Sequence, residues 1–286
     1  MTDPLPPLRD VIARHDLAAK KSFGQHFLLD LNLTAKIASF AGDMSNSEAI
    51  EIGPGPGGLT RAILGAGARH LTVIEKDPRF LPALEEISAA FPGRVNVLEA
   101  DGLTIDEASI LKGEDRVILS NLPYNVGTIL LIKWLQAEPI WWRRAVLMFQ
   151  REVADRIVAG VGDKAYGRLA ILTQSVCAAQ LVMKIPAQAF TPPPKVESAV
   201  VMLDPLPDGR RFEDLQALGI VTASAFGQRR KTLRRSLGQA ASQTTASTEE
   251  LLASAGIEPG ARAETIDIAG FQALARAWRA ARATQP

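Results

Sequence analysis

Short apolar segments alternate with helix-compatible segments through the first half of the chain, and this alternation constrains the fold more than any other feature. Apolar runs of this length, bounded by turn residues, are typical of strands buried on both faces. They cover residues 48–52, 70–75, 94–98 and 116–120, and helices are expected between them over 59–64, 78–91 and 128–136. Strand and helix in alternation predict an α/β fold, a mostly parallel sheet with flanking helices.

The pattern continues beyond the fourth strand. Residues 144–149 predict a further strand, and residues 151–159 predict the helix that follows it. A late strand over residues 196–203 is expected at an edge of the sheet, reached through a hairpin from residues 181–185. The sheet is therefore expected to extend past the strictly alternating part of the chain.

A cluster of Pro, Gly and Asp at residues 204–209 interrupts any regular element, so we place a domain boundary there. Beyond it the chain predicts a small all-α C-terminal domain. Its helices are expected over residues 212–226, 229–237, 248–255 and 268–283, with a loop over 240–248. The expected organisation is an N-terminal tail (1–20), an α/β domain (21–204) and a helical domain (205–286).

Composition excludes several classes of protein. With 47% hydrophobic residues in 286, the chain has enough apolar material for one large or two modest cores, which excludes a disordered protein. A net charge of +1 permits only local basic patches, and residues 205–286 are the more basic part, with 11 Lys and Arg against 8 Asp and Glu. The single cysteine, Cys177, excludes an internal disulfide.

Neither a metal site nor a membrane segment is expected. The three histidines, His15, His26 and His70, stand at no metal-ligand spacing. Apolar runs fall far short of the roughly 20 residues that a membrane span needs, and the first residues do not resemble a targeting signal. We therefore expect a soluble, cytoplasmic protein.

A glycine-rich turn follows the first predicted strand. Gly53, Gly55 and Gly58 have the spacing G-x-G-x-x-G, and Glu51 precedes them. Because such a turn opens a helix and leaves amide groups uncovered, it favours a site for a nucleotide-like cofactor. The spacing alone is a weak signal, since dinucleotide sites share it and a glycine-rich turn without a ligand also satisfies it.

Acidic residues follow the next two strands. Glu75 ends the second strand, 22 residues after Gly53, where a carboxylate can accept both hydroxyl protons of a ribose. Asp101 lies just past the third strand, in position to accept from an adenine amine. Taken alone, Glu75 or Asp101 is equally well explained as an acidic residue solvated at the protein surface. Their shared position at the carboxyl edge of a parallel sheet favours one cofactor site.

The fourth strand ends in Asn121, Leu122, Pro123 and Tyr124. Pro123 supplies no donor and holds Leu122 extended, which leaves carbonyl groups free to accept. With the Asn121 amide oxygen and the flat ring of Tyr124, these carbonyls form a receptor for the exocyclic amine of a stacked base. The alternative is a core tyrosine beside a helix-capping asparagine.

Together these residues resemble the class I S-adenosylmethionine methyltransferases, which have a Rossmann-like fold, and specifically the rRNA adenine dimethyltransferases. The similarity is greatest to the branch that modifies small-subunit rRNA. It departs from the family pattern at His26 (often Asn), Glu197 (frequently Asp) and Arg235 (usually Asn). The matching segments outside the motifs above are residues 21–28, 149–156, 165–168, 190–198 and 225–237.

The resemblance implies S-adenosyl-L-methionine as cofactor. It also implies dimethylation of the N6 amines of two adjacent adenosines in the 3′-end hairpin of 16S rRNA, during small-subunit biogenesis. The partner would be 16S rRNA within the small ribosomal subunit, and we expect a monomer. Residues 191–198 would line the substrate entrance. The expected cofactor-binding residues are His26, Leu28, Glu51, Gly53 (amino-acid end), Gly55, Glu75 (ribose), Asp101 (adenine) and Asn121.

Methyl transfer to an adenine amine needs orientation more than it needs a metal or a strong base. We expect the Asn121 oxygen and a carbonyl near Leu122 to accept the two N–H groups while Tyr124 stacks on the base, which permits direct in-line transfer. Gly127 is compatible with room for a second methyl group, although a glycine at a helix start is the better explanation.

A basic run in the helical domain is the expected RNA contact. Arg229, Arg230, Lys231, Arg234 and Arg235 place five positive charges within seven positions. On a continuous helix the last four share a face, and such a stripe neutralises phosphates. A solvated surface helix accounts for the same charges.

Three other functions stay open at this point. An NAD-dependent oxidoreductase suits the glycine spacing and Glu75 but has no use for the sequence from Asn121 to Tyr124. A ribosome-assembly or nucleic-acid-binding factor without turnover could keep the same surfaces. A methyltransferase acting on large-subunit rRNA would carry the same motifs.

Overall fold

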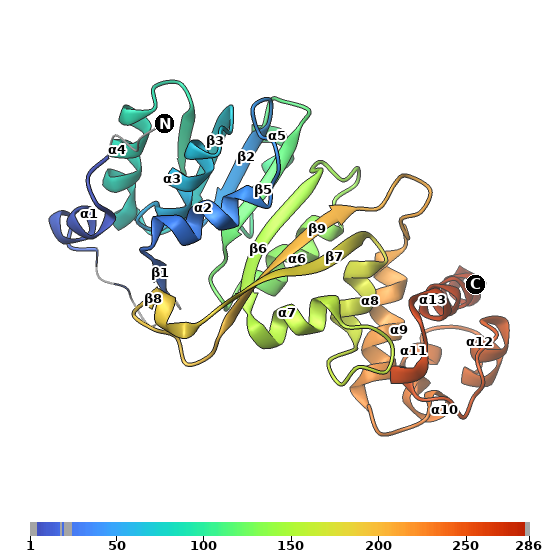
Figure 1. The fold of residues 1–286 in the computed structure, drawn as a ribbon. Helices are drawn as coiled ribbons and strands as arrows, with labels where there is room; N and C mark the ends of the chain where they lie inside the picture. The colour runs from blue at the N-terminus through green and yellow to red at the C-terminus, as the bar shows by residue number, and fades with distance from the viewer. Residues whose placement is uncertain (1–4, 18, 20–24, 284–286) are drawn as a thin grey trace. The chain divides into compact units, whose positions relative to one another are not determined.

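The predicted strands form one seven-stranded sheet in the order β4-β3-β2-β5-β6-β9-β7 (Figure 1). This computed structural model describes residues 5–17, 19 and 25–283. The first five strands in that order are parallel, so their carboxyl ends meet at one edge, as the alternation predicts. They are β4 (Val95–Glu99), β3 (His70–Glu75), β2 (Glu48–Ile52), β5 (Arg116–Asn121) and β6 (Arg144–Gln150).

The other side of the sheet differs from the prediction. β9 (Ser198–Pro205) is antiparallel to β6, and β7 (Cys177–Ile185) forms the edge beyond it. The expectation that residues 196–203 form an edge strand is therefore wrong. Consecutive residues from Ser198 to Val201 are buried, which is typical of an internal strand covered on both faces, whereas β7 has several exposed positions.

Helices connect the parallel strands and pack on both faces of the sheet; in Figure 1, α2 (Leu31–Ser39) lies in front of it and α6 behind it. The helices predicted between the strands are present, except that the first turn of residues 78–91 is the 3-10 turn η2 (Pro78–Phe80). Pro78 has no N–H to place in a helix, and the Asp77 side chain caps the turn. The connecting helices are α3 (Gly58–Gly65), α4 (Leu81–Ala90), α5 (Glu107–Ile110), α6 (Gly127–Leu135) and α7 (Arg151–Val158).

The expected N-terminal tail contains a packed helix. α1 (Leu8–Arg14) buries Leu8 and Val11, and Arg61 of α3 donates a hydrogen bond to the Pro6 carbonyl at 2.7 Å. Residues 8–14 therefore belong to the folded part of the chain.

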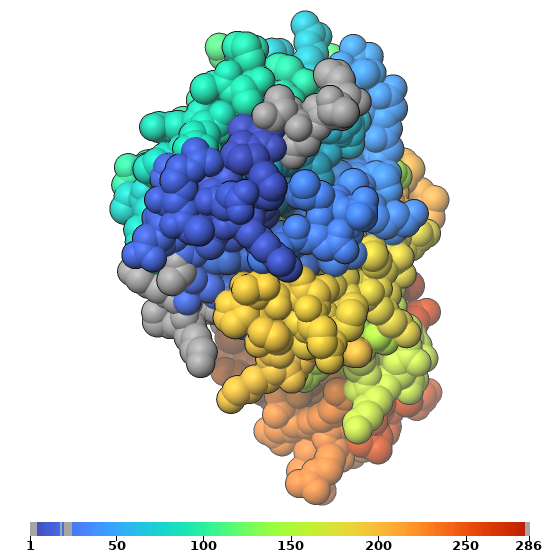
Figure 2. Space-filling view, turned by 60° about the vertical axis from the view of Figure 1, so that its left-hand side comes forward, coloured from blue at the N-terminus to red at the C-terminus, as the bar shows by residue number. Residues whose placement is uncertain are grey.

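A two-stranded sheet joins the N-terminal region to a late segment. β1 (Phe27–Leu28) pairs antiparallel with β8 (Phe190–Thr191), which follows the turn η3 (Ala187–Ala189). Figure 2 shows the yellow segment that contains β8 directly against the blue segment after β1. This pairing brings residues 25–28 beside the sheet edge where the parallel strands end.

The chain divides into two compact units. The first contains Met1–Ala154 and Gln180–Pro205, and the second contains Asp155–Ala179 and Leu206–Pro286. The boundary predicted at residue 204 lies beside one of the points where the chain passes between units. The segment 155–179, expected in the α/β domain, belongs to the second unit because α8 (Arg168–Gln174) packs against α9 (Leu215–Gly227).

The second unit is helical apart from the start of β7. α9 begins three residues later than predicted, where Asp214 caps it, and α11 occupies part of the expected loop 240–248. Trp278 is fully buried in this unit, and its indole nitrogen donates to the Ala240 carbonyl at 2.8 Å. Its remaining elements are α10 (Leu233–Ser236), α11 (Gly238–Ala241), α12 (Thr248–Ser254), η4 (Ala263–Thr265) and α13 (Ile268–Ala283).

Candidate active site

A cavity of about 540 Å³ opens at the carboxyl edge of the parallel strands. Its walls come from the segment around β1 and from the loops after β2, β3, β4 and β5. All of the predicted cofactor-binding and catalytic residues line it: His26, Leu28, Glu51, Gly53, Gly55, Glu75, Asp101, Asn121, Leu122, Pro123 and Tyr124. The sheet topology therefore brings together residues that are up to 98 positions apart in the chain.

The glycine-rich turn is confined on two sides. Gly53 and Gly55 have φ angles of 67° and 54°, which other residues rarely adopt. A Cβ atom on Gly53 would lie 3.5 Å from the Pro123 ring, and one on Gly55 would lie 3.5 Å from the Phe27 ring. The turn thus keeps its backbone close to both neighbouring walls and leaves the space between them open.

Glu75 is held by the backbone. Its Oε2 accepts from the Gly55 amide at 3.1 Å, and its Oε1 accepts from the Asp77 amide at 2.8 Å. Burial raises the pKa of Glu75, although the hydrogen bonds from these amides oppose the shift. The carboxylate therefore has a set orientation and keeps lone pairs available for hydroxyl groups in the cavity.

Glu51 lies deeper and is only 1% exposed. Its Oε2 accepts from the Thr60 hydroxyl at 2.7 Å. Burial raises the pKa of Glu51 to about 8, the Thr60 hydrogen bond opposes that rise, and the nearby Glu75 adds to it. Burial of Glu51 therefore favours its protonated form within the cavity wall.

Asp101 lies toward the solvent side of the cavity. Its Oδ2 pairs with the Lys76 ammonium at 2.7 Å, and its Oδ1 accepts from the Leu103 amide at 2.9 Å. These contacts lower the pKa of Asp101, the Lys76 hydrogen bond having the largest effect. Asp101 is accordingly an ionised acceptor.

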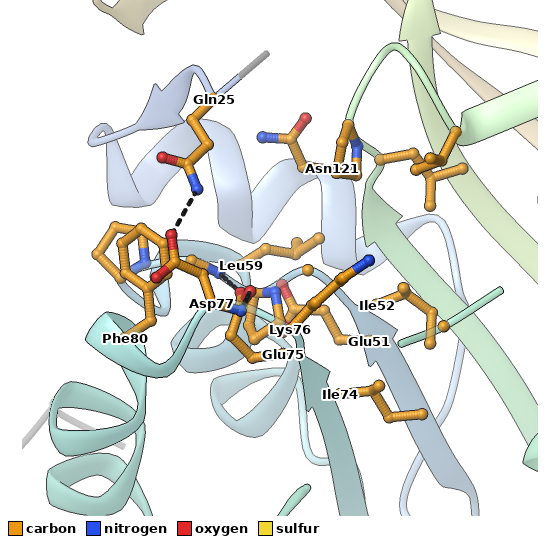
Figure 3. Close-up of a pocket in the computed structure, with 18 of the residues that line it drawn as sticks. Gln25, Glu51, Ile52, Leu59, Ile74, Glu75, Lys76, Asp77, Phe80 and Asn121 are labelled. Atoms are coloured by element: carbon orange, nitrogen blue, oxygen red, sulfur yellow. Dashed lines mark hydrogen bonds between the residues drawn. The ribbon is translucent and has the colours of Figure 1, made fainter. Parts of the chain in front are cut away.

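A polar cluster missed by the sequence analysis closes one end of the cavity. Arg79 pairs with Asp77, with Nη2 to Oδ2 at 2.5 Å, and the Gln25 amide nitrogen lies 3.4 Å from the same oxygen. Figure 3 shows Gln25 pointing to Asp77 above Phe80, with Asn121 farther to the right. One signal was available for Asp77, since it precedes Pro78 at the start of a predicted helix.

Asn121 is oriented by the N-terminal segment. Its Nδ2 donates to the main-chain carbonyl of His26 at 3.3 Å, so its Oδ1 is the end that can accept from a ligand. Asn121 does not cap the next helix, because the N-cap of α6 is Val126.

The carbonyl groups of the residues after Asn121 differ in whether they already accept a hydrogen bond within the protein. The Pro123 carbonyl accepts from the amides of Val126 and Gly127 at 3.1 and 3.0 Å. In the described part of the chain no hydrogen bond is formed to the Leu122 carbonyl. Among the described residues the Leu122 carbonyl is therefore free to accept, which the second acceptor expected beside Asn121 requires.

Tyr124 is half-buried and linked to β9. Its hydroxyl lies 2.6 Å from the hydroxyl of Ser198, which is fully buried. Burial raises the pKa of Tyr124, and the Ser198 hydrogen bond opposes the shift. The His26 ring stands 5.6 Å from the Tyr124 ring at an interplanar angle of 32°, and its Nδ1 donates to the Pro192 carbonyl at 2.8 Å. One side of the tyrosine is thus fixed, and the residue still lines the cavity.

The segment 191–198, expected at the substrate entrance, lies next to two residues of the cavity wall. None of its residues is among those that line the cavity. Pro192 and Ser198 hydrogen-bond to His26 and Tyr124, which do line it. The segment thus supports these two rings, and its place at the substrate entrance stays a prediction.

The basic run does not form the predicted helical stripe. Thr232 is extended (φ −70°, ψ 157°) and forms a β-bridge with Arg262, so α10 begins only at Leu233. The residues before it form a turn, and two of the five charges have protein partners. Arg229 donates to the carbonyls of Lys164 and Tyr166 at 2.8 and 3.0 Å, and Arg234 pairs with Glu249 at 2.8 Å. All five predicted residues, Arg229, Arg230, Lys231, Arg234 and Arg235, are exposed on the second unit.

Residues 5–17, 19 and 25–283 contain neither a metal cluster nor a membrane helix. No group of three or more His, Cys, Asp and Glu side chains in these ranges is arranged to hold a metal ion. No helix in the same ranges has both the length and the apolar character to cross a membrane.

Comparison with solved structures supports the fold. A dimethyladenosine transferase from Plasmodium falciparum superposes with a TM-score of 0.74 and is 24% identical, covering 87% of this chain and 96% of its own. The 23S rRNA methyltransferase ErmE has a TM-score of 0.64 and is 26% identical, covering 88% of this chain and 99% of its own.

Sequence comparison identifies the family. Residues 17–276 match the family described as Ribosomal RNA adenine dimethylase. Proteins named Ribosomal RNA small subunit methyltransferase A from Maricaulis maris and Roseobacter denitrificans are 71% and 57% identical to this chain, over 98% and 96% of its length and 97% of theirs. The chain therefore belongs to the ribosomal RNA adenine dimethylase family, the family that its motifs resemble.

Proposed function

We propose that this protein uses S-adenosylmethionine to dimethylate the N6 amines of two adjacent adenosines in the 3′-end hairpin of 16S rRNA. The observation that carries the proposal is the arrangement of one cavity: its glycine turn and acidic residues line the space proposed for the cofactor, and its Asn121 amide oxygen is free to accept from a substrate amine. The relatives named small subunit methyltransferase A favour the small subunit as the target. Family membership argues against the NAD-dependent oxidoreductase.

The residues of the cavity fit the cofactor. Its volume lies in the usual range of small-molecule sites. Glu75, with both oxygens set by backbone amides, would take the ribose hydroxyls, and the ionised Asp101 would take the adenine amine. The backbone at Gly53, bare of any Cβ atom, would hold the amino-acid end, with His26 and Leu28 closing over it. When bound, S-adenosylmethionine supplies an electrophilic methyl group on a sulfonium.

The chain's own contribution to the chemistry is orientation. The lone pair of an adenine amine is delocalised into the ring, so the amine must be held pyramidal to react. Acceptors at the Asn121 oxygen and the Leu122 carbonyl hold its two N–H groups, and the Tyr124 ring stacks on the base. Orientation of this kind can remove on the order of 7 kcal/mol from a two-reactant barrier. Directly after transfer the methylated nitrogen is cationic, and in that form it is acidic enough to release a proton to water.

The second methylation has one acceptor interaction fewer. Gly127 does not provide the additional space, because a Cβ atom there would lie 3.3 Å from the Leu122 side chain and 3.4 Å from the Phe149 ring. Close packing of the α6 start against these two residues explains this glycine. During the second methylation, the methyl group that was added first must therefore fit on the cavity side of Asn121.

RNA affinity is assigned to the second unit. Arg230, Lys231 and Arg235 are exposed, and their side chains form no ion pair with another described residue, whereas Arg229 holds the turn and Arg234 shares its charge with Glu249. Free cations neutralise phosphates and release counterions. We further propose a cytoplasmic monomer that acts during small-subunit assembly; an assembly role without turnover would use the same surfaces.

The decisive experiment uses unmethylated small subunits and, in a parallel reaction, large subunits. They are incubated with the protein and labelled S-adenosylmethionine, and the labelled nucleotides of both ribosomal RNAs are mapped. Dimethyladenosine at two adjacent positions near the 3′ end of 16S rRNA is expected. Label in 23S rRNA would favour a large-subunit target, and binding of the particle without label would favour the assembly factor.

A further inference from the structure

The side chain of Lys133, on α6, interacts with three acceptors that lie in one short stretch of the chain. Its ammonium donates to the carbonyls of Gly102 and Ile105 at 2.9 and 2.5 Å, and it pairs with the Glu107 carboxylate at 2.8 Å. An ammonium has three donors, so all of them are used. The stretch they hold, residues 101–107, follows β4 and begins with Asp101.

The ionic partner in this cluster is deeply buried. Glu107 is 2% exposed, and its second oxygen accepts from the Trp134 indole at 2.9 Å. Trp134 is 1% exposed and neighbours Lys133 on the same helix. Removing one partner of a buried pair leaves an uncompensated charge, so the cluster resists rearrangement.

The turn that Lys133 holds is shaped around Asp101. The Asp101 carbonyl accepts from the amides of Thr104 and Ile105 at 3.0 and 3.1 Å. On the sheet side the turn has no spare room, because a Cβ atom at Gly102 would lie 2.6 Å from the Ile52 side chain. The turn is therefore fixed between β2 and the Lys133 ammonium.

We infer that Lys133 is a positioning residue. By holding the turn after β4, it keeps the Asp101 carboxylate in the position where it recognises the 6-amino group of the cofactor's adenine. The inference rests on the proposed function and deepens it, since it assigns selectivity for the amine to a residue outside the cavity. Lys76 also contacts Asp101, but its side chain is 75% exposed, whereas that of Lys133 is 29% exposed. Lys133 holds the backbone of the turn, whereas Lys76 contacts the carboxylate itself from an exposed position.

The test compares two ligands by calorimetric titration: S-adenosylhomocysteine, and S-inosylhomocysteine, in which an oxygen replaces the 6-amino group. Lys133→Met should weaken binding of the adenosyl ligand about fivefold to tenfold, as expected for a displaced hydrogen bond. Binding of the inosyl ligand should change less than about twofold. The preference for the amine, measured as the ratio of the affinities for the adenosyl and inosyl ligands, therefore becomes smaller. Lys112→Met, an exposed lysine in the first unit, should leave it unchanged.

A double-mutant cycle shows whether Lys133 acts through Asp101. In an Asp101→Ala background, Lys133→Met should have no further effect on the preference. Glu107→Gln keeps an acceptor for Trp134, so it should reduce the ratio of the two affinities less than Lys133→Met does. This variant provides the test if the Lys133→Met protein does not fold. An unchanged preference, an equal loss for both ligands or additive effects with Asp101→Ala would each overturn the inference alone. Failure of the wild-type protein to bind the adenosyl ligand would overturn the proposed function as well.

Discussion

The side-chain nitrogen of Asn121 donates to the main-chain carbonyl of His26, 95 residues away in the chain, at 3.3 Å. This bond decides which end of the amide faces the cavity, and it makes the residue before β1 part of the site. Because the acceptor is a backbone carbonyl, the bond does not depend on the imidazole, which stands where the family often has Asn. The His26 ring instead supports Tyr124 and anchors the Pro192 carbonyl.

Asn121→Ala should reduce methyl transfer by about 100-fold or more, the usual cost of losing one oriented polar group at a reacting centre. Affinity for S-adenosylhomocysteine should stay within about threefold, since the proposed contacts of Glu75 and Asp101 with that ligand are unchanged. Single-turnover transfer and calorimetric titration measure the two quantities. Asn96→Ala, on the exposed side of β4, serves as the control. Equal losses of transfer and affinity would contradict the assigned role.

Tyr124→Phe keeps the stacking ring but leaves the buried Ser198 hydroxyl without its partner. We expect near-normal transfer and a loss of about 1 kcal/mol in the free energy of unfolding. Adding Ser198→Ala should recover most of that loss, because both polar groups are then absent. Tyr124→Ala should abolish transfer. Denaturant unfolding and a transfer assay check these variants, and an inactive but stable Tyr124→Phe protein would refute the stacking role.

The pH dependence of stability should reflect Glu51. Its pKa is raised from 4.5 to about 8 by burial, so between these values the folded protein keeps a proton that the unfolded chain has lost. The contribution of Glu51 to stability therefore falls as the pH rises from 4.5 to about 8. Glu51→Gln, which keeps an acceptor for Thr60, should flatten the decline in Tm across this window.

Thermal unfolding between pH 5 and pH 8 measures this effect. Glu85→Gln, an exposed substitution on α4, controls for the loss of one negative charge. Burial raises the pKa of Glu75 in the same direction, so some slope should remain in the Glu51→Gln protein. Parallel curves for the wild-type and Glu51→Gln proteins would show that Glu51 is ionised in the folded state.

Salt dependence should identify the residues that bind RNA. Replacing Arg230, Lys231 and Arg235 together by Gln should lower the slope of log affinity against log salt by about 0.7 to 0.9 for each phosphate that is no longer neutralised. Filter binding with the 16S rRNA hairpin at several salt concentrations measures the slope. Arg276→Gln, an exposed charge on α13, is the matched control. An unchanged slope in the triple variant would remove this turn from the RNA interface.

Arg229→Gln should behave differently from those variants. Its guanidinium holds the Lys164 and Tyr166 carbonyls, so the substitution releases the turn from the loop before α8. We expect a lower Tm for the protein as well as weaker RNA binding. Weaker binding at an unchanged Tm would instead indicate that Arg229 binds a phosphate directly.

Local patterns in the sequence were enough to predict the parallel strands and the residues at their carboxyl ends. A buried parallel strand needs a continuous apolar run. Where such a strand ends beside a ligand, the next residues of the chain must include glycine or a polar residue. Both requirements are visible within a few positions, as at Glu51 to Gly58 and at Asn121 to Tyr124. The helices at residues 248–255 and 268–283 were predictable for the same local reason, and the structure places them at Thr248–Ser254 and Ile268–Ala283.

Interactions between distant segments were not predictable in this way. The helical periodicity of residues 229–237 is genuine, but the pairing of Thr232 with Arg262 keeps the backbone extended and breaks the stripe. The same holds for Gln25, whose partner Asp77 is 52 residues away in the chain, and for Lys133, which looks like any lysine near a helix end.

The amino-acid sequence by itself determined which chemistry this chain could hold: a glycine turn, two carboxylates and an amide at successive strand ends. Only the tertiary structure decided how those groups point. The orientation of the Asn121 amide, the protonation of Glu51 and the position of the Asp101 turn each depend on a hydrogen bond or a burial supplied by another part of the fold. Such interactions are set by three-dimensional packing, which spacing along the chain does not specify.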